Sequence, residues 1–373
     1  MKKGLFFIFL TCLSYYLQAQ KQPLVIVGTY NTDTIPGLYI YQFQPKTGML
    51  NFKSSLNVVN PSFICAHPNK PIVYVVNELA TAWESTVSAY LLDTIAGELQ
   101  LINQVPAMGG APCYISIAEN GRWVFTANYL GGNIAAFPIS ENGELQSAQQ
   151  IINFSGNSIN QQRQEASHAH MILLNETNDR AYVTNLGNDS VHVFQLNTKA
   201  NENPLSYLPS LSFKVAQGSG PRHIAINKHH PIVYVLNELS GNITVWKEVN
   251  NSYQLKQTIE TAGISASNKG SAHLLLTADN RFLYSSDRNA YNSISVFKVD
   301  IQNGELTHLQ TLGTKGEKPR HFTIDASGKW LMVGNQNSKS IQLFKRDTQT
   351  GKLITTNYAV GIENPACILP LKW

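Results

Sequence analysis

The stretch GPRHIAINKHHPIVYVLNE (220–238) decides the fold, because its pattern recurs along the chain. It holds a short apolar strand, a polar turn, a second apolar strand and a closing Asn-Glu pair. Similar stretches cover residues 60–78, 111–129, 167–186, 270–288 and 318–336. A seventh copy is split, with NPACILPLKW (364–373) as its first strand and LVIVGTY (24–30) as its second. Such repetition at a nearly constant interval indicates a repeat architecture.

The first strands of the seven copies are anchored roughly 50 residues apart. The anchors are Pro61, Pro112, His168, Pro221, Ser271, Pro319 and Pro365. A third apolar strand follows most copies, and turns such as ENGEL (141–145) and QTGKL (349–353) indicate a fourth. The pattern predicts an all-β protein, a seven-bladed β-propeller of four-stranded antiparallel blades. Pairing of the C-terminal strand with the N-terminal strands would close the ring and remove exposed sheet edges.

The composition excludes one class of function. The 373 residues carry a formal net charge of +4, but the Lys and Arg residues are scattered without a basic stripe or arm. We therefore expect no nucleic-acid partner.

The first residues, MKKGLFFIFLTCLSYYLQAQ, are typical of a secretory signal. We expect a signal peptide over residues 1–19 and a single propeller domain over 20–373, exported to the periplasm or the cell exterior. The apolar stretch is too short for a stable membrane span, so the mature chain should have no transmembrane segment. That chain keeps Cys65, Cys113 and Cys367, an odd number that argues against a full disulfide framework.

The two ends of each repeated stretch should meet in space. In an antiparallel pair the start of strand one lies beside the end of strand two, so Arg222 and His223 should approach Glu238 at one mouth of the central channel. The third position of strand one carries Phe63, Tyr114, His170, His223, His273, His321 and Cys367. Four consecutive blades would thus present histidine, and Arg288, Arg320 and Glu78 join them on the same face. A converging group of titratable side chains is a candidate active site.

Structural explanations exist for parts of this pattern. Propeller channels are wet, and polar groups can line them without chemistry. The repeated Asn77, Asn128, Asn185, Asn237 and Asn335 should bond turn backbone where strand two ends. No Cys-x-x-Cys or His-Glu-x-x-His spacing is present, and the arginines would oppose a cation, so we expect neither metal nor cofactor.

The chain resembles the seven-bladed lactonase family, which includes propeller-type 6-phosphogluconolactonase and the carboxy-cis,cis-muconate cyclising enzyme. The resemblance rests on HAHMILLNETNDRAYVTNLG (168–187), GPRHIAINKHHPIVYVLNELSGNITVW (220–246) and RFLYSSDRNAYNSISVF (281–297), among other stretches. It implies a catalytic group made of His170, Arg222, Glu238 and Arg288. One departure is Asn185-Leu186-Gly187, where the family often has Asp-Leu-Gly.

The resemblance implies hydrolysis of a sugar lactone such as 6-phosphogluconolactone. Glu238 or His170 would be the general base, and Arg222 and Arg288 would bind substrate anion and stabilise the oxyanion. The substrate-binding residues would be His168, His223, His273, Arg320, His321 and Glu78. A lactonising cyclase acting on a dicarboxylate, or a non-catalytic binding propeller, are the alternatives. We expect a monomer, and export favours a lactone found outside the cytoplasm, for which an unphosphorylated sugar lactone is a candidate.

Overall fold

The computed structural model describes residues 22–32, 34–261, 269–289 and 291–371. The expected signal peptide over residues 1–19 and its cleavage point lie outside this range. Within the described part of the chain, no helix is long and apolar enough to cross a membrane.

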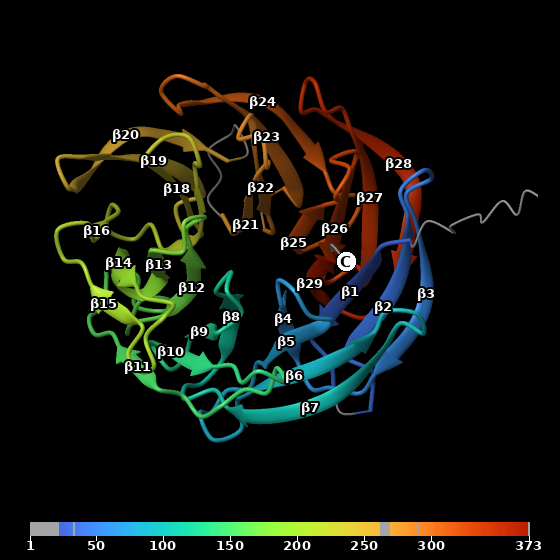
Figure 1. Cartoon of the computed structure of the whole chain (residues 1–373). Coiled ribbons are helices and arrows are strands. Elements are labelled where there is room, and N and C mark those ends of the chain that lie inside the picture. The colour runs from blue at the N-terminus through green and yellow to red at the C-terminus, as the bar shows by residue number, and fades with distance from the viewer. Residues whose placement is uncertain (1–21, 33, 262–268, 290, 372–373) are drawn as a thin grey trace, which may run out of the picture.

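Seven antiparallel sheets stand around a central axis, and Figure 1 shows them as a ring of blades. The innermost strands are β4 (Pro61–Ala66), β8 (Pro112–Ile117), β12 (Ala169–Leu174), β17 (Pro221–Ile226), β21 (Ser271–Leu276), β25 (Pro319–Ile324) and β29 (Pro365–Pro370). The second strands are β5 (Ile72–Asn77), β9 (Trp123–Asn128), β13 (Arg180–Asn185), β18 (Ile232–Asn237), β22 (Phe282–Asp287), β26 (Trp330–Asn335) and β1 (Leu24–Thr29).

The outer half of each blade completes the four-stranded pattern. The third strands are β6 (Thr86–Asp93), β10 (Asn133–Pro138), β14 (Ser190–Leu196), β19 (Asn242–Val249), β23 (Ser293–Val299), β27 (Ser340–Arg346) and β2 (Leu38–Gln44). The outermost strands are β7 (Glu98–Pro106), β11 (Gln150–Asn153), β15 (Leu205–Tyr207) with β16 (Phe213–Lys214), β20 (Ser252–Glu260), β24 (Leu306–Gly313), β28 (Leu353–Gly361) and β3 (Met49–Leu56). The predicted seven-bladed propeller is confirmed, with one outer edge divided between the two short strands β15 and β16.

The split blade closes the ring as predicted. β29 pairs antiparallel with β1, with Val27 opposite Ile368, and β1 continues into β2 and β3. Figure 1 shows the C-terminal strand β29 beside the N-terminal strand β1. The two ends of the chain therefore complete one four-stranded sheet, and neither β29 nor β1 is left as a single unpaired strand.

Burial explains why the second strands are apolar at almost every position. β5, β9, β18, β22, β26 and β1 are buried along their whole length, because both faces of each blade pack against neighbours. One core cluster, for example, joins Ile232 and Leu236 of β18 to Leu274 and Leu283 of the next blade. The outermost strands meet solvent on one side, so the residues of β7 and β20 are exposed or only partly buried.

Four of the five repeated asparagines bond backbone as we expected, whereas Asn237 bonds the side chains of Asn242 and Thr244. The Nδ2 of Asn128 donates to the carbonyl of Ala107 at 3.0 Å, and that of Asn335 donates to the carbonyl of Thr314 at 3.1 Å. Each bond ties the end of a second strand to the segment that enters the same blade. These side chains thereby fix the backbone on the face where strand one begins.

A second recurring contact joins the outer edges of neighbouring blades. The side-chain amide of Gln257 on β20 donates to the carbonyl of Leu306 at 2.8 Å and accepts from its N–H at 2.8 Å. Gln150 makes the same two-point contact with Leu205, and Gln310 with Leu353. The glutamine side-chain amide thus pairs with the backbone of the next blade's outermost strand, as a neighbouring strand would.

Replacing Gln257 with alanine removes both bonds to Leu306. We expect the free energy of unfolding, measured by urea denaturation, to fall by about 1–2 kcal/mol. Gln254→Ala is the matched control, because Gln254 is exposed on the same strand and should cost less than about 0.5 kcal/mol. Equal losses in the two variants would show that the amide does not link the blades.

Candidate functional site

The start of strand one and the end of strand two meet on one face of the disc. Pro221 pairs with Asn237, and the N–H of Glu238 donates to the carbonyl of Gly220 at 2.8 Å. The same arrangement occurs in other blades, where Pro61 pairs with Asn77 and Pro319 pairs with Asn335. The predicted meeting of the charged ends is therefore confirmed.

A β-bulge at the start of strand one turns one side chain out of the ladder in every blade. Between Pro221 and His223 the register shifts, so Arg222 has no partner on β18, and Arg320 is in the same situation on β25. Bulges of this kind re-aim a side chain next to functional sites. Here they direct two arginines toward the channel mouth.

The register corrects the sequence alignment in one blade. Ala169, not His168, pairs with the closing Asn185, so Ala169 is the equivalent of Pro221. His170 consequently occupies the bulged position of Arg222, and Met171 that of His223. Three blades rather than four carry histidine at the third position: His223, His273 and His321. The error arose because β12 begins with alanine instead of proline, and the preceding His168 was aligned with the first residues of the other innermost strands.

Glu238 lies at the centre of the charged cluster. Its Oε2 is 2.9 Å from Nε of Arg222 and 3.1 Å from Nη2 of Arg288, and its Oε1 is 2.8 Å from Nη2 of Arg163. The Glu238 side chain is only 5% exposed, as against 15% for Arg288 and 42% for Arg163. Burial opposes ionisation, but Arg288, Arg222 and Arg163 together outweigh it and hold the pKa of Glu238 well below its ordinary value.

Arg163 is a member of this cluster that the repeat pattern did not reveal. It belongs to the segment between β11 and β12, which lies outside the repeated stretch. The neighbouring Gln164 is fully buried and donates to the carbonyl of Leu186 and to Oδ1 of Asp189, which anchors the segment. Arg163 also donates to the hydroxyl of Tyr129 at 3.3 Å. No spacing rule could have found a residue in a segment without a counterpart in other blades.

His168 stacks on Tyr129 beside this cluster. The two rings are 4.3 Å apart and nearly parallel. The Nδ1 of His168 lies 3.0 Å from the carbonyl oxygen of Tyr129, and its Nε2 lies 3.0 Å from Oε1 of Glu165. Both ring nitrogens are therefore occupied, and the histidine forms part of the wall of the mouth.

A second charged group stands across the mouth. The Tyr30 hydroxyl donates to Oε2 of Glu78 at 2.7 Å and accepts from Nη2 of Arg320 at 2.5 Å. The Arg320 guanidinium also lies over the Tyr30 ring, 4.9 Å from its centre. The side chains of Arg320 and Glu78 are 16% and 17% exposed, so both can be reached from solvent. Tyr30 follows β1 as Glu238 follows β18, so the repeat places it on this face, although we did not select it as a site residue.

His170 and the other channel histidines are buried beneath the arginines. His170 is 5% exposed, and its Nδ1 lies 3.8 Å from the Cys113 sulfur. Among the residues that the structure describes, its Nε2 has no hydrogen-bond partner. Burial, followed by Arg222, lowers the pKa of His170 well below 6.5, so the imidazole is neutral at pH 7. His223, His273 and His321 lie deeper in the channel, and the pKa of His321 is lowered to about 3, chiefly by burial.

The cluster therefore combines excess positive charge with a neutral imidazole. Arg163, Arg222, Arg288 and Arg320 face the carboxylates of Glu78 and Glu238. Such a site can bind an anion and stabilise negative charge that develops during a reaction. Among the described residues, no group of three or more His, Cys, Asp or Glu side chains has a geometry that could hold a metal ion.

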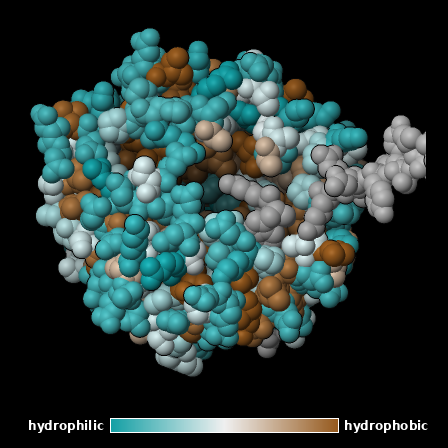
Figure 2. Space-filling model, in the orientation of Figure 1, coloured by the Kyte–Doolittle hydropathy of each residue, from teal (hydrophilic) through white to brown (hydrophobic). Residues whose placement is uncertain are grey.

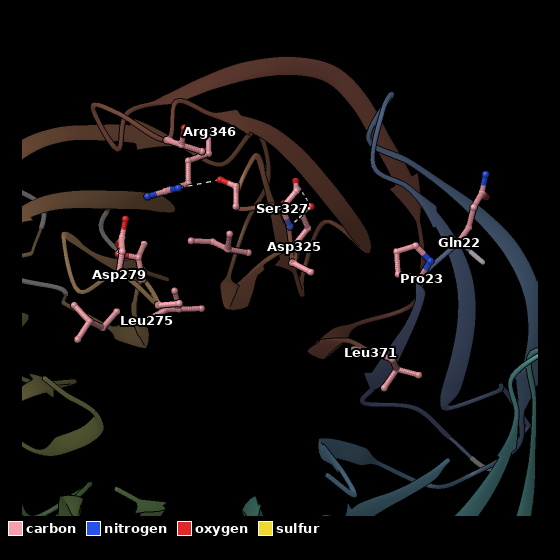
Figure 3. Close-up of a pocket in the computed structure, with 15 residues that line it drawn as sticks. Gln22, Pro23, Leu275, Asp279, Asp325, Ser327, Arg346 and Leu371 are labelled. Carbon is pink, nitrogen blue, oxygen red and sulfur yellow. Dashed lines mark hydrogen bonds between the residues drawn. The ribbon is translucent and has the colours of Figure 1, made fainter. Parts of the chain in front are cut away.

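A separate cavity of about 880 Å³ lies at the other end of the innermost strands, where β21, β25 and β29 end. In Figure 3, Asp325, Ser327 and Arg346 line one side of it, and Pro23 and Leu371 lie across from them. Asp325 accepts hydrogen bonds from Ser327, Lys329 and Trp330, which places its carboxylate in a turn. This cavity is wide, but its lining includes none of the clustered histidine, arginine and glutamate groups.

Figure 2 shows one face of the disc, which is polar overall and hollowed near its centre.

Comparison with known proteins agrees with this architecture. The family described as "Lactonase, 7-bladed beta-propeller" matches residues 24–370. A 6-phosphogluconolactonase of Formosa agariphila is 32% identical over 333 residues, which cover 88% of this chain and 94% of the relative. A 6-phosphogluconolactonase of Bacillus subtilis is 29% identical over 347 residues, with coverage of 92% and 96%.

A solved structure with the same fold is the periplasmic gluconolactonase PpgL of Pseudomonas aeruginosa. It is 28% identical, superposes with a TM-score of 0.86, and the match covers 94% of this chain and 99% of the other. With the family description matching nearly the whole described range, the chain belongs to the seven-bladed β-propeller lactonase family.

Proposed function

We propose that the protein hydrolyses a sugar lactone to the corresponding aldonic acid. The observation that carries this proposal is the convergence of four guanidinium groups and the neutral His170 at one mouth of the channel. Ester hydrolysis needs a group that accepts a proton from water and positive charge where the carbonyl oxygen becomes an oxyanion. Membership of the lactonase family supports the same reaction.

His170 is the general base in this proposal. The two oxygens of Glu238 are already paired with Arg163, Arg222 and Arg288, so neither oxygen is available to accept a proton from water. His170 is neutral, and its Nε2 is free to meet a water molecule. The water oxygen attacks the lactone carbonyl carbon while its proton passes to Nε2. When the tetrahedral intermediate collapses, the ring C–O bond breaks and the imidazolium returns the proton to the departing alkoxide.

The arginines supply the positive charge that the proposed reaction needs. Arg288 and Arg320 are partly exposed, so they are placed to face the developing oxyanion or an anionic substituent of the substrate. Glu238 acts as a positioning residue that holds Arg222 and Arg288 and compensates their charge. A guanidinium fork fits phosphate and carboxylate equally well, so the cluster would also suit a dicarboxylate that undergoes lactonisation. The proposed reaction requires no cofactor.

The substrate is a six-carbon sugar lactone, with or without a phosphate. The curated relatives are 6-phosphogluconolactonases, whereas the Pseudomonas protein is a periplasmic gluconolactonase. Export through the N-terminal signal stays a prediction, and N-terminal sequencing of the secreted chain tests it. If the chain is exported, we propose that an unphosphorylated lactone is the natural substrate. The monomeric state also stays a prediction, which sedimentation analysis would test.

The chain from Gln20 onward should accelerate hydrolysis of gluconolactone, 6-phosphogluconolactone or both at low pH, where spontaneous opening is slow. His170→Ala should lower kcat roughly 100-fold or more, because the proton acceptor is lost. The rate is measured by titration of the released acid, and thermal unfolding checks the fold. A fully active His170→Ala protein would contradict the assignment of the base, and the absence of acceleration by the wild type would favour a cyclase or a binding protein.

Glu238→Gln tests the centre of the arginine cluster. The variant keeps the shape of the side chain but leaves three guanidinium groups without a carboxylate. We expect kcat to fall roughly 10- to 100-fold and the protein to lose about 2–4 kcal/mol of stability, because buried like charges then face one another. Urea unfolding and the activity assay are run on the same preparation. Glu84→Gln, on an exposed position of the same face, is the control and should change neither quantity.

Arg163 should decide the preference for a phosphorylated substrate. It is the most exposed guanidinium in the cluster, so it can leave Tyr129 to meet a substrate phosphate. We expect Arg163→Ala to raise KM for 6-phosphogluconolactone roughly tenfold more than KM for gluconolactone. Arg122→Ala serves as the control, since Arg122 is exposed outside the cluster. A parallel change of both KM values would show that Arg163 only supports Glu238.

A further inference from the structure

Arg222 is held from below by a hydrogen-bonded pair of histidines. Its Nη1 donates to the carbonyl of Ala272 and to Nε2 of His223, the latter at 3.1 Å. The Nδ1 of His223 then lies 2.9 Å from Nδ1 of His273. Arg222, His223 and His273 are 2%, 2% and 7% exposed, so bulk water cannot substitute for these contacts. The chain of contacts runs from Glu238 through Arg222 into the channel.

Elementary hydrogen-bond chemistry fixes the protons in this chain. A guanidinium has donors but no acceptor, so Nε2 of His223 must accept and cannot carry a proton. His223 must then be protonated on Nδ1, which donates to His273. His273 accepts on Nδ1 and carries its own proton on Nε2. One arginine thereby specifies the tautomers of two histidines in series and requires both rings to be neutral.

The surroundings of the pair also exclude a positive charge. His223 faces Arg222, His170 at 5.4 Å between ring centres, and the rings of Tyr114 and Phe63. His273 faces His321 at 4.1 Å between ring centres and the edge of Phe322. His321 in turn accepts a hydrogen bond on Nδ1 from the N–H of Ile368 at 3.2 Å. No carboxylate contacts either ring among the described residues, so an imidazolium here would meet only arginine and further imidazoles.

We propose that His223 and His273 are positioning residues, a neutral imidazole pair that fixes the guanidinium of Arg222 in the lactonase site. This role rests on the proposed function, because Arg222 belongs to the proposed catalytic group. It differs from the substrate contact that the family resemblance suggested for the two histidines, since both are buried beneath the arginine. Protonation of either ring would place two donors against each other and release Arg222.

Two substitutions separate the contact with Arg222 from other effects. In His223→Gln the amide oxygen takes the place of Nε2 and can still accept from Arg222. In His223→Asn the shorter amide can replace only Nδ1, so the arginine loses its acceptor. We expect His223→Gln to keep kcat within about threefold of wild type and His223→Asn to lose roughly 10- to 100-fold in kcat, with KM changed less. Equal activity of the two variants, at similar thermal stability, would overturn the proposal.

Nuclear magnetic resonance tests the pair without any activity. The ¹⁵N shifts of the imidazole rings should show His223 protonated on Nδ1 and His273 protonated on Nε2, with neither ring charged at pH 6. A charged ring, or a proton on Nε2 of His223, would contradict the proposal. This result does not depend on substrate. Absence of lactonase activity would therefore refute the proposed function, whereas the resonance shifts alone would show whether the histidine pair holds Arg222.

The pair also predicts a measurable proton uptake on unfolding. The pKa of His223 in the folded protein is well below 6.5, chiefly through burial and Arg222, whereas the unfolded chain has the ordinary value. At pH 5.5 unfolding therefore binds a proton at His223, and stability falls as the pH drops below about 6.5. We expect His223→Gln to reduce the uptake at pH 5.5 by about one proton.

Discussion

The antiparallel pairing of β29 with β1 is the constraint on which the rest of the molecule depends. It joins residues from opposite ends of the chain into one blade and closes seven sheets into a ring. Closure forces the first residues of all seven innermost strands toward one axis. Groups as distant in sequence as Tyr30 and Arg320 are thereby brought within hydrogen-bonding distance. An open array of the same blades would have neither a central channel nor a shared site.

Several side chains of the site belong to residues that have no partner in the hydrogen-bonded ladder between the first and second strands. At the bulge in each innermost strand one residue loses its partner, and the chain uses that position for His170, Arg222 and Arg320. Glu238 follows the adjacent strand and balances the arginine charge. Buried charges of one sign are tolerated only when opposite charges lie against them, which explains why one carboxylate touches three guanidinium groups. Backbone irregularity and charge pairing together concentrate reactive groups at one mouth.

The channel below the site shows how a polar interior can be kept without charge. His223 and His273 fill space that leucine could fill, yet they provide an acceptor that faces a buried arginine. Because the chain of donors and acceptors has a single direction, it allows one tautomer at each ring. The histidines of the innermost strands therefore have different tasks. Within the described part of the chain, Nε2 of His170 has no hydrogen-bond partner. His223 instead bonds both Arg222 and His273.

The sequence by itself determined the seven blades, the closure by the two chain ends and the face on which Arg222, His223 and Glu238 meet. Strand periodicity and a repeat of nearly constant length are local properties, so they can be read directly from the residues. Tertiary structure decided the bulge register that moved His170 to the position of Arg222, and it decided the partners of Glu238. Arg163 entered the cluster only through folding, because it lies in a unique connecting segment. Tyr30 stands at the repeat position of Glu238, but its bonds to Glu78 and Arg320 join residues of different blades. Their contacts depend on the distance between blades, which no spacing along one chain specifies.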